Sequence, residues 1–120
     1  MLQTVAKRRL ERVVPNTAAE HLRDFCRDAK RALPGKITGV ILFGSRARGD
    51  ARRDSDYDVA VLVQGLDDRR SVDHALADTA YPHILAGFHI RPVAIPADFL
   101  TASPRSGFAM ALLRDGVMVS

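Results

Sequence analysis

Two apolar runs of seven residues, separated by a polar loop, constrain the fold of this chain more than any other feature. Residues 37–43 and 57–63 are largely apolar, and short apolar runs bounded by glycine or charged residues are typical of buried strands. Because apolar residues occur on both faces of each run, we expect central strands of a sheet. The loop over residues 44–56 then joins the end of one buried strand to the start of the next.

The first part of the chain predicts helices. Residues 2–14 carry apolar side chains at helical spacing with basic residues between them, which favours a short amphipathic helix packed at the domain edge. Thr17 and Glu20 have the spacing of a capping box. An apolar stripe follows up to Leu33, so the sequence predicts a helix that begins at Thr17.

The second half predicts two further helices and a third strand. The helix after the second apolar run is expected to end or kink at Pro82, because proline lacks an amide donor. Residues 88–95 predict a strand, which Pro92 places at a sheet edge or a bulge. Ser103 is the expected N-cap of a last helix that stops at Gly116 before a short strand. This order predicts an α/β (α+β) fold, a small mixed β-sheet with helices packed on it.

Composition fits one domain over residues 1–120, in which residues 1–16 form a basic N-terminal extension. A chain of 120 residues with 47% apolar content can bury one core. The single cysteine, Cys26, rules out an internal disulfide and lies on an apolar helical stripe, which indicates a packed thiol. No apolar segment follows the basic N-terminus, and no run approaches about 18 apolar residues. We therefore expect a cytoplasmic protein with no membrane partner.

Charge is distributed unevenly along the chain. Residues 1–53 contain 13 Lys or Arg against 5 acids, and residues 54–120 contain 5 against 9. A basic first half attracts phosphate-bearing substrates or nucleic acid through long-range steering. Nucleic acid is the weaker alternative, because two tyrosines and no tryptophan leave few surfaces on which bases can stack.

The central loop carries two groups with complementary chemistry. Asp56 and Asp58 are two residues apart at the start of a strand, so both carboxylates point to the same face. A cation relieves their repulsion, and magnesium takes one or two carboxylates together with water and substrate phosphates. Gly44 and Ser45 end the preceding strand and can bring backbone amides and a hydroxyl close to those phosphates. Each motif alone also fits a turn or a strand cap, but their combination indicates a metal and phosphate site.

The pattern Gly44-Ser45, ten residues, Asp56-x-Asp58 between two strands resembles the nucleotidyltransferase superfamily founded on DNA polymerase beta, in particular its minimal members. The resemblance covers about residues 17–120 and implies the nucleotidyltransferase fold. It also implies that Gly44 and Ser45 contact the triphosphate and that Asp56 and Asp58 are catalytic metal ligands for magnesium. The implied reaction transfers a nucleoside monophosphate, AMP foremost, from a nucleoside triphosphate such as ATP to a hydroxyl acceptor.

Arginines near the motif leave the activity open. Arg46 and Arg48 either bind phosphate through two hydrogen bonds each or lie on the loop surface.

Members of the resembling family usually place a third carboxylate on the next strand, facing the first two. Here that strand carries Arg91 and no acid, while Asp98 behind it fits a cap and His89 an ordinary strand position. If Arg91 points at the pair, its guanidinium takes the place of one metal charge, which favours binding over catalysis.

The resemblance also implies a partner. Minimal nucleotidyltransferases often act as the antitoxin of a toxin–antitoxin pair, with a separate HEPN-domain protein as the toxin that they bind or modify with AMP. Two interpretations follow: a magnesium-dependent nucleotidyltransferase whose acceptor is such a partner, or a weakly active or inactive module of the same fold that neutralises its partner by binding.

Overall fold

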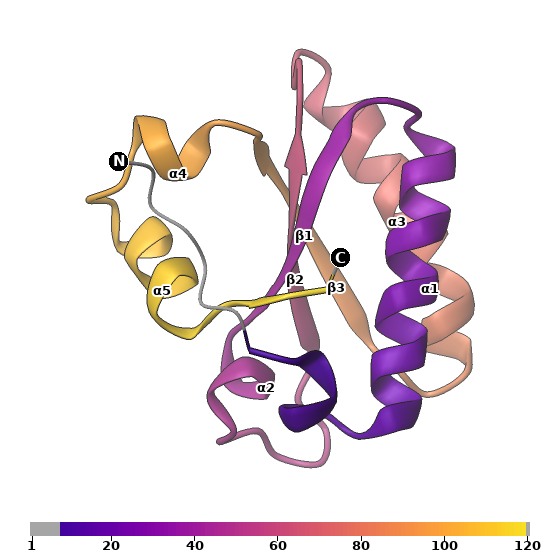
Figure 1. The fold of residues 1–120 in the computed structure, drawn as a ribbon. Helices are drawn as coiled ribbons and strands as arrows, with labels where there is room; N and C mark the ends of the chain where they lie inside the picture. Colours follow the sequence, from indigo (N-terminus) through magenta and orange to yellow (C-terminus); the bar gives the residue numbers. More distant parts are fainter. Residues whose placement is uncertain (1–7, 120) are drawn as a thin grey trace.

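The structure is a computed structural model that describes residues 8–119, and in these residues helices lie on both faces of a four-stranded sheet (Figure 1). In chain order the elements are the 3-10 turn η1 (Leu10–Arg12), α1 (Asn16–Ala32), β1 (Ile37–Phe43), α2 (Ser45–Arg48), β2 (Tyr57–Val63), α3 (Arg69–Leu85), β3 (Ile90–Pro96), α4 (Phe99–Ala102), α5 (Gly107–Asp115) and β4 (Val117–Met118). The strands lie in the order β3-β2-β1-β4, with β2 parallel to β3 and β1 antiparallel to both of its neighbours. The mixed sheet with packed helices confirms the expected fold class.

The two central strands alternate between two apolar clusters. Val40 and Leu42 of β1 join the larger core beneath α1 and α3, whereas Ile41 of β1 and Ala60 of β2 join a smaller cluster with Leu112 of α5. Figure 1 shows α1 and α3 together on one side of the sheet, and α4 and α5 on the other. Because both faces are covered by helices, β1 and β2 are apolar on both faces, as expected for central strands.

The chain before α1 packs against the larger core. Of the helix expected over residues 2–14, residues 1–7 lie outside the described part, and the remainder forms only the turn η1. Leu10 and Val14 are 1% and 5% exposed. Arg23 of α1 forms an ion pair with Glu11, and that hydrogen bond lowers the pKa of Glu11 from 4.5 to about 2. The turn is therefore attached to α1 by both apolar and charged contacts.

Helix α1 begins one residue earlier than expected. Pro15 is its N-cap, and no side chain caps the helix, so the capping box predicted for Thr17 and Glu20 is wrong. The carbonyl of Pro15 accepts the amide of Ala19 at 2.9 Å, which closes the first turn ahead of Thr17. Cys26 is 1% exposed in the core, as the apolar stripe predicted.

Pro82 is predicted to end or kink the third helix; α3 continues through Pro82 to Leu85, so an end at Pro82 is wrong and a kink stays a prediction. Pro82 is exposed, so water can reach the carbonyl that lacks its usual amide partner.

The last helix also differs from its prediction. Ser106, not Ser103, is the N-cap of α5, and its Oγ accepts the amide of Ala109 at 3.0 Å. Ser103 instead closes the short helix α4, which the apolar pattern did not predict.

A pair of histidines joins α1 to α3. Nδ1 of His21 lies 2.8 Å from Nδ1 of His83, and the His21 ring stacks on Phe88 with centroids 4.2 Å apart. Burial, and secondly the charge of His21, lower the pKa of His83, whereas Asp28 and Asp24 on α1 oppose this shift. Only one proton fits between the two facing nitrogens, so protonation of both rings disrupts the contact between these helices.

Strand β3 forms an edge of the sheet, as Pro92 predicted. Arg69 of α3 donates to the carbonyl of Ala94 at 2.8 Å, which satisfies one outward group of that edge. Pro92 lacks an amide hydrogen, and Pro96 at the end of the strand lacks another. Within residues 8–119, no helix has the length and apolar character that crossing a membrane requires.

Candidate functional site

The polar loop turns sharply where β1 ends. Gly44 has φ 77° and ψ −157°, a backbone region that is essentially restricted to glycine. A β-carbon built on Gly44 lies 2.8 Å from Oδ2 of Asp58, so the Gly44 backbone packs directly against that carboxylate. Ser45 follows as the first residue of α2. The first amides of a helix have no acceptor within it, so those at the start of α2 can bind an anion.

Asp56 and Asp58 converge on one guanidinium. Nε of Arg91 donates to Oδ1 of Asp58 at 2.8 Å, and Nη1 of Arg91 lies 3.9 Å from Oδ2 of Asp56. The sheet sets this pairing, because Asp58 and Arg91 are register partners across the parallel strands β2 and β3. The two carboxylates thus lie on one face, as their spacing predicted, and Arg91 points at them.

The carboxylate pair lies on the less covered face of the sheet. Because side chains alternate along a strand, Asp58 lies on the same face of β2 as Ala60, which belongs to the smaller cluster beneath α4 and α5. The side chains of Asp58, Asp56 and Arg91 are 15%, 41% and 66% exposed, respectively. A substrate can therefore reach both carboxylates from solvent, and Asp58 is the more enclosed.

The side chain of Arg46 holds the loop together. Its Nε and Nη2 donate to the carbonyl of Ser55 at 3.2 and 3.0 Å, and Nη2 also donates to the carbonyl of Arg53 at 3.1 Å. The guanidinium carbon lies 4.4 Å from the centroid of the Tyr57 ring. These contacts join α2 to the stretch that carries Asp56. The predicted grip of Arg46 on phosphate stays a prediction, and it requires the guanidinium to leave these carbonyls.

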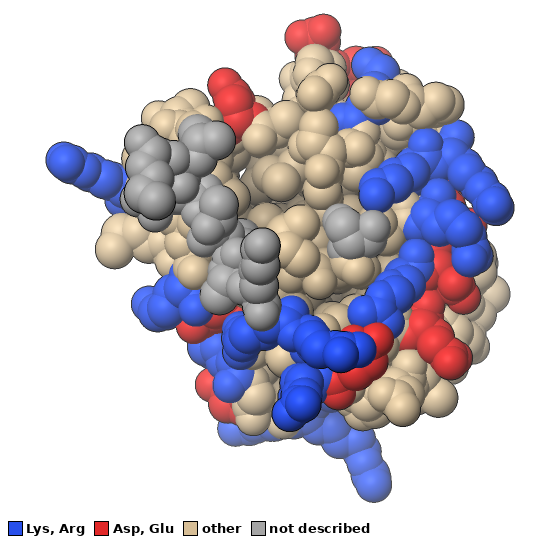
Figure 2. Space-filling model, in the orientation of Figure 1, with Lys and Arg blue, Asp and Glu red and all other residues tan. Residues whose placement is uncertain are grey.

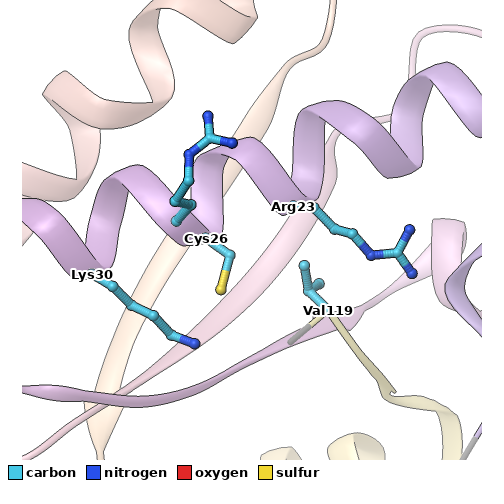
Figure 3. A pocket seen from close by; sticks show the side chains of 5 residues that line it. Arg23, Cys26, Lys30 and Val119 are labelled. Carbon is cyan, nitrogen blue, oxygen red and sulfur yellow. The ribbon is translucent and has the colours of Figure 1, made fainter.

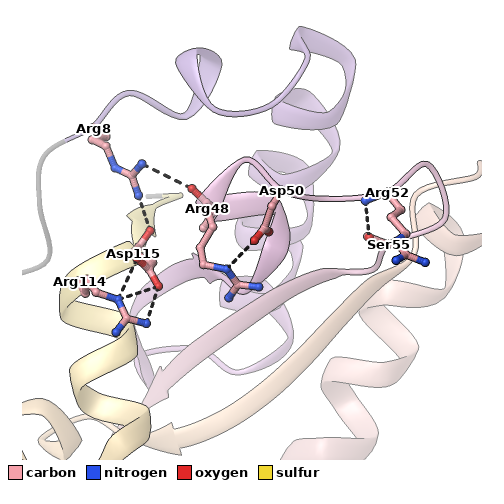
Figure 4. Close-up of polar contacts among 8 residues, drawn as sticks. Arg8, Arg48, Asp50, Arg52, Ser55, Arg114 and Asp115 are labelled. Atoms are coloured by element: carbon pink, nitrogen blue, oxygen red, sulfur yellow. Dashed lines mark hydrogen bonds and ion pairs between the residues drawn. The ribbon is translucent and has the colours of Figure 1, made fainter.

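Two further arginines contact the region of α2: Arg48, for which a phosphate contact was predicted, and Arg8, for which no role was predicted. Nε of Arg48 is 3.3 Å from Oδ2 of Asp50 (Figure 4), so the predicted phosphate contact of Arg48 also competes with an existing ion pair. Arg8 donates to the carbonyl of Ala47 at 3.4 Å and to the carbonyl of Asp115. Arg8 joins α2 to the end of α5 across 107 positions of sequence, a separation at which no local pattern signals a contact.

Surface hollows formed by residues 8–119 include the following two, and neither is lined by Asp56 or Asp58. One of about 280 Å³ is lined by Arg46, Arg53, Asp54, Ser55, Tyr57, Gly87, Phe88 and His89. The other, of about 510 Å³, is lined by Arg23, Cys26, Arg27, Lys30 and Val119. Figure 3 shows the second hollow between α1 and the end of β4. Its arginines are already paired with acids of η1 and α1.

Basic residues gather on part of the surface. Figure 2 shows Lys and Arg side chains along α1 and at the end of the molecule where η1 and α2 lie in Figure 1. Acidic side chains are interleaved with them. The basic excess of the first half of the sequence thus lies partly beside the Gly44 turn, where it favours the approach of an anion.

The carboxylate pair fits a magnesium ion that arrives with phosphate. Within residues 8–119, no group of three or more His, Cys, Asp or Glu side chains is arranged to hold a metal. Asp56 and Asp58 supply hard oxygen donors, and magnesium completes its shell from water and substrate phosphates when few protein ligands are present. The residues present therefore suit a shared metal and phosphate site rather than an all-protein cage.

Comparisons with known proteins agree with this geometry. The family model described as "Polymerase beta, Nucleotidyltransferase" matches residues 21–88. A candidate protein adenylyltransferase of Methanocaldococcus jannaschii is 47% identical over 47 residues, which are 39% of this chain and 48% of that protein. The chain thus spans about half the length of this curated relative.

Solved structures share the fold at low sequence identity. A candidate nucleotidyltransferase from Sulfolobus solfataricus superposes with a TM-score of 0.62 at 14% identity, covering 96% of this chain and 90% of that one. A mutant of the toxin–antitoxin MntA-HpeT gives a TM-score of 0.51 at 18% identity, covering 82% of this chain and 72% of that one. These likenesses concern the fold.

Proposed function

The chain belongs to the polymerase beta nucleotidyltransferase family, and on that premise we propose that it transfers a nucleoside monophosphate, AMP foremost, from a nucleoside triphosphate to a hydroxyl acceptor. One observation carries the proposal. The carboxylates of Asp56 and Asp58 lie close enough together to contact the same guanidinium, that of Arg91, and Asp58 packs against the turn at Gly44. This arrangement supports a metal-bound triphosphate with its phosphates at the turn.

Each group has a role in the proposed reaction. Asp56 and Asp58 would hold magnesium, which neutralises charge on the phosphate oxygens and aligns the reacting groups. The absence of a side chain at Gly44 lets the turn close against Asp58, and the amides and hydroxyl at Ser45 bind the phosphates. Arg46 keeps the loop in place through its carbonyl contacts.

The chemistry is a displacement at the α-phosphorus. The acceptor oxygen forms a bond to that phosphorus, the bond to the bridging oxygen of the β-phosphate breaks, and pyrophosphate leaves with the electron pair. The proton of the acceptor hydroxyl is lost to water, which reaches the site because Asp56 is 41% exposed. The protein contributes position and charge rather than a covalent intermediate.

We further propose that the acceptor is a separate protein, a HEPN-domain toxin in a toxin–antitoxin pair. The candidate adenylyltransferase relative acts on protein by its name, and the MntA-HpeT structure is named a toxin–antitoxin. The HEPN identity rests on the resemblance of the Gly44 to Asp58 motif to minimal nucleotidyltransferases.

Labelled ATP tests the reaction. The protein is incubated with magnesium, the product of the adjacent gene and ATP labelled either at the α-phosphate or at the γ-phosphate. We expect label on the partner from the α position only, reduced at least about 100-fold by Asp56→Asn or Asp58→Asn. Asp54→Asn in the same exposed loop is the matched control and keeps the activity. Transfer of the γ label, or equal transfer by all three variants, contradicts the proposal.

The second candidate function is neutralisation by binding alone. The observation that favours it is the ion pair of Arg91, which already supplies a cation to both carboxylates. In that case the partner forms a stable complex that carries no label and does not respond to Asp56→Asn or Asp58→Asn. The labelling experiment therefore separates the two functions when complex formation is measured in the same samples.

A further inference from the structure

Among residues 8–119, Arg91 is the arginine that forms ion pairs with both Asp56 and Asp58. It is held there by the register of β2 and β3 rather than by a loop, because its Cα lies opposite that of Asp58. The bond to Asp58 is short and directional, at 2.8 Å from Nε, whereas the contact with Asp56 is looser, at 3.9 Å. The guanidinium thus lies where the two carboxylates converge.

We propose that Arg91 is an internal counter-cation that competes with free divalent metal for Asp56 and Asp58, so that the ion is taken up with the nucleotide rather than before it. This inference rests on the proposed function, because it assumes that these two carboxylates form the metal site. The inference concerns whether the Arg91 guanidinium or a divalent metal ion contacts the two carboxylates when nucleotide is absent.

Charge explains the competition. With Arg91 in contact, the three side chains carry one net negative charge, and without it the two carboxylates carry two. A free divalent ion must displace the guanidinium or bind beside a like charge, and the carboxylates that residues 8–119 offer it at this site are those of Asp56 and Asp58. At an exposed site, removal of one positive charge at contact distance is expected to tighten metal binding about tenfold.

Phosphate changes the outcome because it offers Arg91 a replacement partner. A nucleotide brings oxygens that complete the shell of the metal and also accept hydrogen bonds from a guanidinium, which binds phosphate in a bidentate manner. The Arg91 side chain is 66% exposed, so it can move from the carboxylates to a phosphate without leaving a buried position. The same residue therefore opposes free metal and tolerates or assists the metal–nucleotide complex.

Manganese titration of the whole chain tests the inference. Binding of Mn²⁺ alone is measured by electron paramagnetic resonance, and then in the presence of α,β-methylene ATP. We expect Arg91→Met to bind Mn²⁺ alone about tenfold more tightly than the wild type, while its affinity for the Mn²⁺–nucleotide complex is unchanged or weaker. Arg91→Lys keeps the charge and stays near the wild type for Mn²⁺ alone.

The matched control is Arg114→Met. Arg114 is 69% exposed and paired with a carboxylate on α5, so it has a similar environment away from the site and changes net charge equally. We expect it to alter Mn²⁺ binding less than twofold. Thermal unfolding of each variant verifies that it is folded.

The outcomes separate the inference from the proposed function. Mn²⁺ binding that depends on Asp58 but is not tightened by Arg91→Met overturns the inference and leaves the metal site standing. Equal tightening by Arg91→Met and Arg114→Met also overturns it, because the effect is then one of net charge. Absence of Mn²⁺ binding in every variant, with or without nucleotide, overturns both.

Discussion

Replacement of Gly44 by alanine is expected to damage the site and the fold together. The backbone of Gly44, at φ 77° and ψ −157°, lies in a region that alanine adopts at a cost of about 1–3 kcal/mol. The new β-carbon would also lie 2.8 Å from Oδ2 and 3.6 Å from Cγ of Asp58. Because real β-carbons essentially never approach an atom this closely, the Asp58 carboxylate must turn away from Gly44, which disturbs its bond to Arg91.

The two contributions can be added for an expected magnitude. Backbone strain supplies about 1–3 kcal/mol, and the ion pair of Asp58 with Arg91, in which the arginine is solvated at 66% exposure, supplies at most about 1 kcal/mol. Gly44→Ala should therefore lower the free energy of unfolding by about 1–4 kcal/mol. The displaced carboxylate should also weaken binding of the metal–nucleotide complex at least about tenfold, because one of only two protein ligands is lost.

Gly49→Ala is the matched control, because it introduces backbone strain without bringing the new β-carbon against another side chain. Gly49 ends α2 with φ 87° and ψ 10°, and a β-carbon built there meets no atom within 4 Å. Its left-handed backbone costs alanine about 1–2 kcal/mol. Urea unfolding followed by circular dichroism measures stability, and titration with Mn²⁺ and α,β-methylene ATP measures binding. If Gly44→Ala binds the complex as tightly as Gly49→Ala does, the reasoning about Asp58 is refuted.

Three further predictions concern the fold. Ser106→Ala should lower the free energy of unfolding by about 1 kcal/mol through loss of the α5 cap, whereas Ser103→Ala should change it by less than about 0.5 kcal/mol; equal losses in urea unfolding contradict the assignment of the cap. Because the folded protein lowers the pKa of His83 from 6.5, stability should be complete above pH 6.5 and fall as pH drops below it, by at most about 1.4 kcal/mol per pH unit. His83→Gln should remove that part of the slope between pH 8 and 5, and an unchanged slope speaks against buried His83 as its source. Gly116→Ala places a β-carbon 2.3 Å from a carbonyl oxygen of α5 and should cost about 1–3 kcal/mol by crowding; a melting temperature equal to the wild type refutes that crowding.

Local patterns accounted for most of the elements and failed at several of their ends. The apolar runs predicted the bounds of β1 and β2, and Pro92 indicated an edge strand. The predicted caps at Thr17 and Ser103 were wrong, because the first turn closes on Pro15 and a short extra helix precedes α5. Cap patterns involve four or so residues, so small shifts in where the chain packs decide between neighbouring candidates.

Sequence was sufficient for the chemistry that lies within one loop. The alternation of side chains along a strand predicts that Asp56 and Asp58 share a face. This feature depends on bond geometry over a few residues, so it can be deduced without a fold, whereas the approach of Gly44 to Asp58 depends on the antiparallel register of β1 and β2. The tertiary structure decided which cation meets the pair, because Arg91 is 33 positions from Asp58 in sequence and its approach depends on the parallel register of β2 and β3. Strand register is set by the packing of the whole sheet between its helices, which no stretch of the chain specifies alone.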